Sequence, residues 1–157
     1  MNATKPLYIF DLDGTVRNLQ HRLHHLSNLK DKHRWRRFEE ACELDAPMPN
    51  VIHVLETLKR CGADIWFFTS CSTAVRMQTE QWLANHTTMT RKELSEALVM
   101  RDVGDYNPDD LLKLLWLQGM CYEDRQRLVC VFEDRDRVVA MWRKNGVVCL
   151  QVADGDF

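Results

Sequence analysis

Two carboxylates one residue apart, Asp11 and Asp13, follow a short apolar run and precede a Gly-Thr pair. The first carboxylate of such a pair could attack phosphorus and form an aspartyl-phosphate. The second could protonate the leaving oxygen and later activate a water molecule. The spacing is compatible with phosphate-ester hydrolysis, but Asp-x-Asp by itself fits a calcium site or an ordinary turn equally well.

Polar side chains also follow two later apolar runs. Thr69 and Ser70 end the run "DIWFFTS", and Glu133 and Asp134 come at the end of "RLVCVF". Because ligands bind at the carboxyl ends of the strands in a parallel sheet, we expect these side chains beside the first acidic pair. Clustered carboxylates repel one another unless a cation neutralises them, and hard oxygen ligands select Mg²⁺. The expected magnesium ligands are Asp11, Asp13, Glu133 and Asp134.

A basic side chain is needed as well, because the transferring phosphoryl group carries negative charge. Lys113 is the lone basic residue in the helical pattern "DDLLKLLWL". It is therefore a candidate for this cation. Taken alone, such a lysine is more often a solvated surface residue, and its catalytic role rests on the family resemblance given below.

The elements that must position these residues alternate along the chain after residue 50. Short apolar runs alternate with helical patterns, which predicts an α/β fold with a parallel sheet covered on both faces. Thr90 and Glu93 form a capping box, and Asn107 and Pro108 mark another helix start. The predicted strands are 7–10, 64–70, 97–100, 127–133 and 147–152, and the predicted helices include 50–60, 73–85, 107–119 and 136–145.

Residues 17–48 interrupt this alternation. They contain no strand-like run and show two helical patterns, around "LQHRLHHL" and "RWRRFEEACEL". We predict a small helical cap, inserted after the first strand of a single domain that spans residues 1–157.

The first part of this cap is basic. Residues 17–37 contain seven Lys or Arg, four His and one acid. Such a surface could attract a nucleic-acid end or a nucleotide, with a solvated helix face as the alternative. We interpret Trp35 and Phe38 as residues that pack the cap, with base stacking as the alternative. The expected substrate contacts are Arg34, Arg36 and Arg37.

The composition excludes several other classes of protein. A chain of 157 residues with 45% hydrophobic and 28% charged residues is typical of one globular domain and not of a disordered chain. No apolar stretch is long enough to span a membrane, and we find no signal-peptide core. Six scattered cysteines without a CxxC pair favour free thiols. These features favour a cytoplasmic protein.

Two other residue types near the acidic motifs are given no catalytic role. Cys71 has no neighbouring histidine that could activate it, so we interpret it as a bystander. His21, His24 and His25 have no Cys or acid at metal-ligand spacing, and we interpret them as exposed cap residues.

The segment "DLDGT" resembles the first motif of haloacid dehalogenase-type phosphatases. Thr69, Lys113 and the Glu133–Asp134 pair are similar, in order, to the second, third and fourth motifs of that superfamily. The stretches "DDLLKLLW" and "EDRDRVVAMWRKNGVVCLQVADGDF" are similar to the phosphatase domain of bacteriophage polynucleotide kinase/3′-phosphatases. No P-loop pattern is present, so we expect no kinase half here. The resemblance implies a Rossmann-like sheet of the haloacid dehalogenase type.

The resemblance also implies a role for each matching residue. Asp11 would be the nucleophile and a Mg²⁺ ligand. Asp13 would be the general acid and base, and its carbonyl oxygen would also bind the metal. Lys113 would hold both the nucleophile and the phosphate. The remaining matches would bind phosphate (Thr69 and Ser70), metal (Asp134, supported by Glu133) and substrate (Arg135).

Two departures from the resemblance concern the second and fourth motifs. The phage phosphatases carry Ser-Gly-Arg where this chain has Thr69, Ser70 and Cys71, so the arginine has no counterpart at that position. Glu133 replaces the usual first Asp of the acidic pair and has a longer reach. The first departure concerns the identity of the substrate, and the second bears little on the chemistry.

We predict a Mg²⁺-dependent phosphomonoesterase that acts through an aspartyl-phosphate and removes terminal 3′-phosphates from nucleic acid. One alternative is a phosphatase of free nucleotides or other small phosphomonoesters. Another is a non-catalytic phosphate-binding scaffold, although a binding module has no need of the acid/base residue Asp13. The expected partner is a phosphorylated nucleic-acid end or nucleotide and not a membrane, in the host cytoplasm if a phage encodes the protein. The sequence leaves open whether the chain forms a homo-oligomer.

Overall fold

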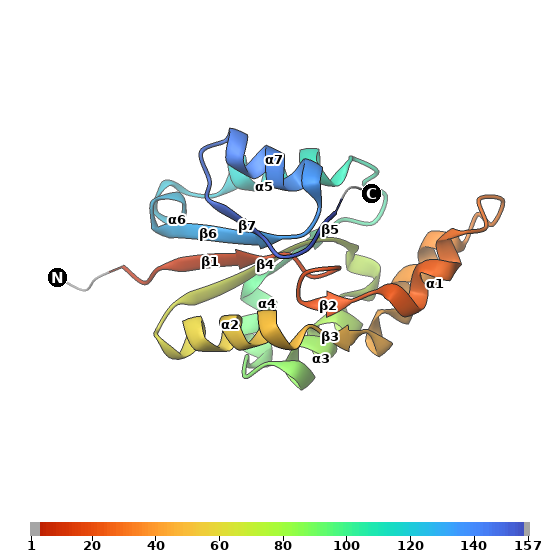
Figure 1. The fold of residues 1–157 in the computed structure, drawn as a ribbon, viewed down its shortest axis with the longest axis horizontal. Helices are drawn as coiled ribbons and strands as arrows, with labels where there is room; N and C mark the ends of the chain where they lie inside the picture. The colour runs from red at the N-terminus through yellow and green to blue at the C-terminus, as the bar shows by residue number, and fades with distance from the viewer. Residues whose placement is uncertain (1–3, 156–157) are drawn as a thin grey trace.

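A five-stranded parallel sheet runs through the computed structural model, which describes residues 4–155 (Figure 1). The strand order is β5-β4-β1-β6-β7, so the first strand lies in the middle. The strands are β1 (Leu7–Phe10), β4 (Asp64–Ser72), β5 (Leu98–Arg101), β6 (Leu128–Glu133) and β7 (Cys149–Gln151). The predicted α/β class is confirmed, with all five predicted strands present.

The register of the central strands brings their carboxyl ends to one edge. Phe10, the last residue of β1, pairs with Phe67 of β4 and with Phe132 of β6. The rings of Phe10 and Phe132 stack with their centroids 4.3 Å apart. Because these apolar residues are buried in the sheet, the polar residues that follow each strand emerge together at the same edge.

Helices cover both faces of the sheet (Figure 1). On one face, Leu55, Trp82 and Leu94 belong to one buried cluster. On the other, Leu117 and Trp142 belong to a second. The first face carries α2 (Pro49–Arg60), α3 (Arg76–His86) and α4 (Arg91–Ala97), and the second carries α5 (Asp109–Gly119) and α7 (Asp136–Lys144). A one-turn 3₁₀ helix (Thr73–Val75) precedes α3, and the short α6 (Tyr122–Arg127) precedes β6.

The two predicted helix starts differ in outcome. The capping box of α4 is present, because Thr90 and Glu93 exchange side-chain to backbone hydrogen bonds. The start of α5 was predicted one residue too early: Pro108 is its N-cap residue, and no side chain caps it. Asn107 instead donates its backbone N–H to the side chain of Asp105 in the preceding loop, at 2.8 Å.

The segment 17–48, called the cap segment below, projects beyond the carboxyl edge of the sheet (Figure 1). The prediction that it contains no strand was wrong. Two-residue strands, β2 (Arg17–Asn18) and β3 (Ala46–Pro47), pair antiparallel where the segment leaves and rejoins the core. They are too short to give an alternating pattern in the sequence. Both expected helical stretches are present, as a 3₁₀ helix η1 (Gln20–Leu26) and as α1 (Arg34–Glu40) followed by η2 (Ala41–Leu44).

None of the helices in the described part of the chain is long and apolar enough to cross a membrane.

Candidate active site

Three carboxylates meet at the carboxyl edge of the sheet. Asp11 leaves the end of β1, where its backbone N–H donates to the carbonyl of Phe132 at 2.9 Å. Glu133 ends β6, and Asp134 follows it. All three acids are buried, and one carboxylate oxygen from each lies within 4.8 Å of the others. The strand order therefore assembles acids that are far apart in the sequence.

Lys113 reaches these acids from α5. Its Nζ donates to Oδ1 of Asp11 and to Oε2 of Glu133, each at 2.6 Å. The side chain is buried, so the alternative of a solvated lysine is wrong. Burial by itself would lower the pKa of Lys113, but the two carboxylates raise it above its ordinary value. Lys113 therefore stays charged beside the candidate nucleophile.

One ammonium group does not balance three buried carboxylates. Burial, followed by the charge of Glu133, raises the pKa of Asp11 to about 7 although Lys113 opposes the shift. Burial and the charge of Asp11 raise the pKa of Asp134 to about 6. A divalent cation would relieve this repulsion, and carboxylate oxygens are the ligands that Mg²⁺ prefers. Asp11, Glu133 and Asp134 therefore fit a magnesium ion.

Gly14 permits this arrangement. Its φ is +93°, and a Cβ there would overlap the carboxylate of Asp134. The next residue, Thr15, donates its hydroxyl to Oδ1 of Asp134 at 3.3 Å. The Gly-Thr pair after the two aspartates thus lets the first motif pack directly against the fourth.

The carboxylate of Asp13 is not among the three that meet, which corrects the expectation that four carboxylates cluster. Its Oδ1 accepts hydrogen bonds from Nε of Arg17 at 2.5 Å and from Nη2 of Arg22 at 2.8 Å. Burial would raise the pKa of Asp13, but the two guanidinium groups outweigh burial and lower it. Asp13 is therefore a charged carboxylate in this structure.

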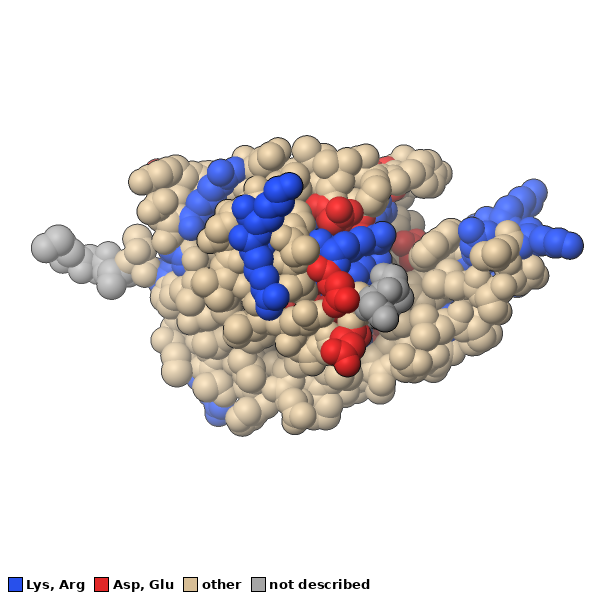
Figure 2. Space-filling view, turned by 45° about the horizontal axis from the view of Figure 1, so that its top comes forward, with Lys and Arg blue, Asp and Glu red and all other residues tan. Residues whose placement is uncertain are grey.

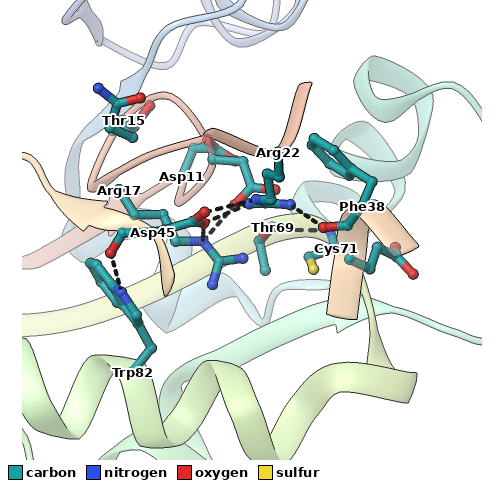
Figure 3. Close-up of polar contacts among 12 residues, drawn as sticks. Asp11, Thr15, Arg17, Arg22, Phe38, Asp45, Thr69, Cys71 and Trp82 are labelled. Atoms are coloured by element: carbon teal, nitrogen blue, oxygen red, sulfur yellow. Dashed lines mark hydrogen bonds and ion pairs between the residues drawn. The ribbon is translucent and has the colours of Figure 1, made fainter. Parts of the chain in front are cut away.

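Arg17 and Arg22 belong to the cap segment, and neither side chain is exposed. The buried Asp45 binds both, at 3.2 Å to Nε of Arg17 and 2.7 Å to Nη2 of Arg22 (Figure 3). From the sequence, both arginines were counted with the surface cations of the cap. Their pairing with Asp13 could have been predicted, because they are the first two basic residues after Asp13 and a buried carboxylate needs a cation.

The second motif lies beside these groups. Thr69 is fully buried, and its Oγ1 accepts a hydrogen bond from the backbone N–H of Cys71 at 3.2 Å. Ser70 faces the cavity described below, and its carbonyl accepts from Nε of Arg101 at 2.9 Å. Burial and the charge of Asp13 raise the pKa of the Cys71 thiol. A protonated thiol is a poor nucleophile, which agrees with the interpretation of Cys71 as a bystander.

A cavity of about 500 Å³ opens above these residues, between the core and the cap segment. Asp11, Asp13, Lys113 and Ser70 line its base, together with Glu133, Asp134 and Cys71. Arg135 also lines it, as predicted for a substrate-binding residue, and pairs with Asp109.

Asp109 is a cavity residue that the sequence analysis missed. It is buried one helical turn before Lys113 and binds Arg137 as well, at 2.5 Å. The sequence could have indicated this residue, because Asp109 lies four positions before Lys113 and so shares one face of α5 with it.

The three predicted arginines of α1 do not line the cavity. Arg34 donates to the carbonyl of Leu29 at 2.7 Å. Arg36 pairs with its neighbour Glu40 at 2.7 Å, and Arg37 pairs with Asp31 at 3.3 Å. Figure 2 shows Lys and Arg side chains gathered at the far end of the cap, away from the core. Their contact with substrate stays a prediction, and it applies only to a substrate that extends beyond the cavity.

Trp35 and Phe38, both interpreted from the sequence as residues that pack the cap, differ in the structure. Phe38 is buried and lies against the Arg22 guanidinium, 4.1 Å from the ring centroid, which confirms its packing role. Trp35 packs edge-on against Phe38, but it is 57% exposed and lines the cavity, so packing covers only part of its surface.

The histidines of the cap form no metal-binding group. Nε2 of His21 lies 2.7 Å from Oδ1 of Asp45, while His24 is exposed. Within residues 4–155, the one group of acids, histidines or cysteines close enough to hold a metal is Asp11, Glu133 and Asp134.

Comparison with known proteins gives the family of the chain. Residues 5–157 match the model of the polynucleotide kinase PNKP phosphatase domain. A chain from the Pnkp1/Rnl/Hen1 RNA repair complex is 28% identical with a TM-score of 0.74, over 100% of this chain and 47% of that one. This chain thus spans about half the length of that relative.

Two more distant structures share the fold. The class C acid phosphatase from Bacillus anthracis with tungstate bound is 16% identical, with a TM-score of 0.61 over 99% of this chain and 70% of its own. CbbY from Rhodobacter sphaeroides in complex with phosphate is 14% identical, with a TM-score of 0.62 over 98% of this chain and 88% of its own. The expected Rossmann-like fold of the haloacid dehalogenase type is confirmed.

Proposed function

Because this chain belongs to the family of polynucleotide kinase PNKP phosphatase domains, we propose that it is a Mg²⁺-dependent phosphatase that removes 3′-phosphates from nucleic-acid ends. The observation that carries the proposal is the buried group at the base of the cavity, where Lys113 holds Asp11 beside Glu133 and Asp134. A nucleophile, a fixed cation and a set of metal ligands face the same cavity.

Asp11 attacks phosphorus in the first step. Lys113 donates a hydrogen bond to its Oδ1 and so holds the carboxylate in place. A bond forms between a carboxylate oxygen of Asp11 and phosphorus as the bond from phosphorus to the leaving oxygen breaks, and the leaving oxygen takes up a proton. Mg²⁺, when bound, neutralises charge on the phosphoryl oxygens and on the carboxylates. Water then attacks the aspartyl-phosphate, which releases phosphate and restores Asp11.

Asp13 is the candidate for both proton transfers. A charged Asp13, held by Arg17 and Arg22, is the form that can accept a proton from the attacking water. To protonate the leaving oxygen in the first step, Asp13 must first gain a proton, which the two arginines oppose. We expect the negative charge of the incoming phosphate to offset the two guanidinium charges and so to raise the pKa of Asp13.

The choice of a nucleic-acid end as substrate rests on the family and on a neighbour from an RNA repair complex. This chain spans about half of that neighbour, so the activities and partners of a longer protein do not follow from it. Free nucleotides are the second candidate, and the cavity under the cap segment favours them because it has room for a small molecule. A non-catalytic scaffold is disfavoured by the buried contact between Lys113 and Asp11.

A substrate panel tests the proposal. One oligonucleotide sequence carries phosphate at its 3′ end or at its 5′ end, and nucleoside 3′- and 5′-monophosphates and a small aryl phosphate complete the set. We expect the highest kcat/KM for the 3′-phosphorylated oligonucleotide with Mg²⁺, and none above background in excess chelator. Ca²⁺, which is larger and coordinates more loosely, should bind without supporting good turnover.

Purified Asp11→Asn is the control for contaminating phosphatase. A preference for nucleoside monophosphates would favour the second candidate, and full activity in chelator would contradict the magnesium requirement.

A further inference from the structure

The cavity is larger than a phosphate group needs, and its cap side is apolar. About 500 Å³ is the size of a small-molecule site, whereas the phosphoryl chemistry occupies only its base. Among the described residues that line its cap side, Glu39 is the one charged side chain. The apolar residues there are Leu19, Leu23, Leu26, Trp35 and Phe38. The part of the substrate that lies beyond the phosphate therefore meets a hydrophobic wall.

Trp35 is the most exposed aromatic residue of that wall. Its ring lies edge-on to the ring of Phe38, with the centroids 6.0 Å apart and the planes at 84°. Phe38 is itself held against Arg22, the partner of Asp13. Trp35 is therefore supported on one side while more than half of its surface remains open.

The helix that carries Trp35 is fixed to the phosphate end of the cavity. Glu39 lies one turn later on α1, and its Oε1 accepts a hydrogen bond from the backbone N–H of Ser72 at 3.0 Å. Ser72 ends β4, two residues after Ser70. Because residues four apart share one face of a helix, this bond sets the position of Trp35 relative to the second motif.

A second aromatic side chain borders the same cavity from the core. Tyr106 lies in the loop between β5 and α5, is 92% exposed and lines the cavity. Arg101 holds this loop on both sides of it: Nη1 donates to the carbonyl of Asp105 at 3.1 Å and to that of Asn107 at 2.7 Å. The Nε of Arg101 also binds the carbonyl of Ser70, so the loop is tied to the second motif as well.

We propose that Trp35 and Tyr106 form a base-binding site, in which the base of the nucleotide that carries the phosphate stacks on Trp35 and is covered by Tyr106. The inference rests on the proposed function and specifies its substrate as a single unpaired terminal nucleotide. Aromatic rings stack on every base, so the site does not select among the four bases.

The test compares substrates that differ only in the terminal base. One is an oligonucleotide with a 3′-phosphate, and the other has an abasic sugar as its last, 3′-phosphorylated unit. Stacking on one base corresponds to about 5- to 150-fold in affinity. We expect Trp35→Ala to lower kcat/KM on the base-bearing end by a factor in this range, mainly through KM, and to have little effect on the abasic end.

The other variants separate stacking from folding. Trp35→Phe should recover part of the loss because a smaller aromatic ring remains, and Tyr106→Ala should cause a smaller, base-dependent loss. Leu29→Ala removes an exposed apolar side chain of the cap that does not line the cavity, so it should change neither substrate. The thermal midpoint of each variant checks that the cap segment is intact.

Several outcomes would overturn the base-binding site while the proposed function stands. One is an equal loss of kcat/KM on the base-bearing and the abasic end in Trp35→Ala, and another is no loss on either substrate. The third is a wild-type protein with the same kcat/KM for both ends. A wild type inactive on 3′-ends but active on nucleoside 5′-monophosphates would contradict the proposed function instead. The same variants would then be compared on that substrate and on ribose 5-phosphate, with the same criterion for stacking.

Discussion

Asp11 is held by one ammonium group although two other carboxylates share its surroundings. Burial and the charge of Glu133 raise the pKa of Asp11 to about 7, so the free protein near neutral pH contains both its protonated and its charged form. Only the charged form can attack phosphorus or bind a metal. Metal binding and proton release are therefore linked at this residue.

The first prediction concerns the two aspartates of the first motif. Asp11→Asn should abolish turnover because an amide cannot attack phosphorus, while the fold should persist. Asp13→Asn should lower kcat by about 10²- to 10⁴-fold through the loss of acid/base catalysis. Single-turnover kinetics on purified variants, with circular dichroism as the control for folding, measure both effects. Near-normal turnover by folded Asp11→Asn would rule out the covalent mechanism.

The second prediction concerns Gly14. Gly14→Ala should abolish activity, because its Cβ would collide with the carboxylate of Asp134 in addition to straining a positive φ. Gly62→Ala is the matched control, since Gly62 has a φ of +89° and no atom within 4 Å of an added Cβ. Both should lose about 1 kcal/mol of stability or more from backbone strain. Only Gly14→Ala should lose activity. Equal kcat values in the two variants would contradict the close packing of Gly14 against the Asp134 carboxylate.

At the scale of elements, short helices place the residues that face the cavity. Asp109 and Lys113 lie one turn apart on α5, and both are buried against the carboxyl edge of the sheet. Trp35 and Glu39 lie one turn apart on α1 in the same way. Helical spacing thus decides which pairs of residues act together.

The capping box of α4 gives a prediction about stability and pH. The Thr90 backbone N–H and the Lys59 ammonium lower the pKa of Glu93 to about 2, against an ordinary value of 4.5. Since the pKa is depressed in the folded state, the charged form stabilises the fold above about pH 4.5. This contribution should fall between pH 4.5 and pH 2 as Glu93 is protonated.

The measurement is urea unfolding of wild type and Glu93→Ala across this pH range. Because Glu93 is partly exposed, we expect a difference of only about 0.5–1 kcal/mol at pH 7, which narrows below pH 4.5. Glu96→Ala, an exposed acid on the same helix, is the control. A difference that stayed constant with pH would mean that the charge of Glu93 contributes nothing.

At the scale of the whole molecule, a buried ionic network joins the cap segment to the active site. Asp45 binds Arg17 and Arg22, the two partners of Asp13. The indole N–H of Trp82, on α3, donates to the carbonyl of Asp45 at 2.8 Å. Movement of the cap segment would therefore disturb the residue proposed to transfer protons.

The basic far end of the cap gives the last prediction. Replacement of Arg34, Arg36 and Arg37 by Glu should weaken the binding of long phosphorylated oligonucleotides, because these residues lie outside the cavity where only an extended substrate reaches. Each lost phosphate contact should reduce the salt dependence of single-strand binding by a slope of about 0.7. Hydrolysis of a small aryl phosphate should hardly change.

The control variant reverses Arg60, Lys92 and Arg125, three exposed cations outside the cap segment, with the same change in net charge. Measurements of kcat/KM for both substrates at several salt concentrations compare the two variants. Equal losses on both substrates would mean that the cap segment folds badly without its arginines. No loss on either would mean that these side chains form a solvated face.

The sequence by itself determined the α/β class, the positions of the five strands and the acids at their ends. These features depend on local patterns, because the spacing of apolar residues and the residue that follows each strand are visible within a few positions. The motif residues Asp11 and Asp134 could be named for the same reason, since strands of a parallel sheet end at a common edge. Lys113, on a helix, was assigned from the resemblance to a known family. Elements of two residues, such as β2, left no pattern to detect.

Only the tertiary structure decided how charged residues pair. Arg22 and Arg36 are the same residue type in one basic segment, yet Arg22 is buried against Asp13 and Asp45 while Arg36 lies in solvent beside Glu40. Trp35 and Phe38 differ in a similar way, because both line the cavity but Trp35 is largely exposed while Phe38 is buried. The physical reason is that burial and charge pairing depend on partners distant in the sequence, which only the folded chain brings together.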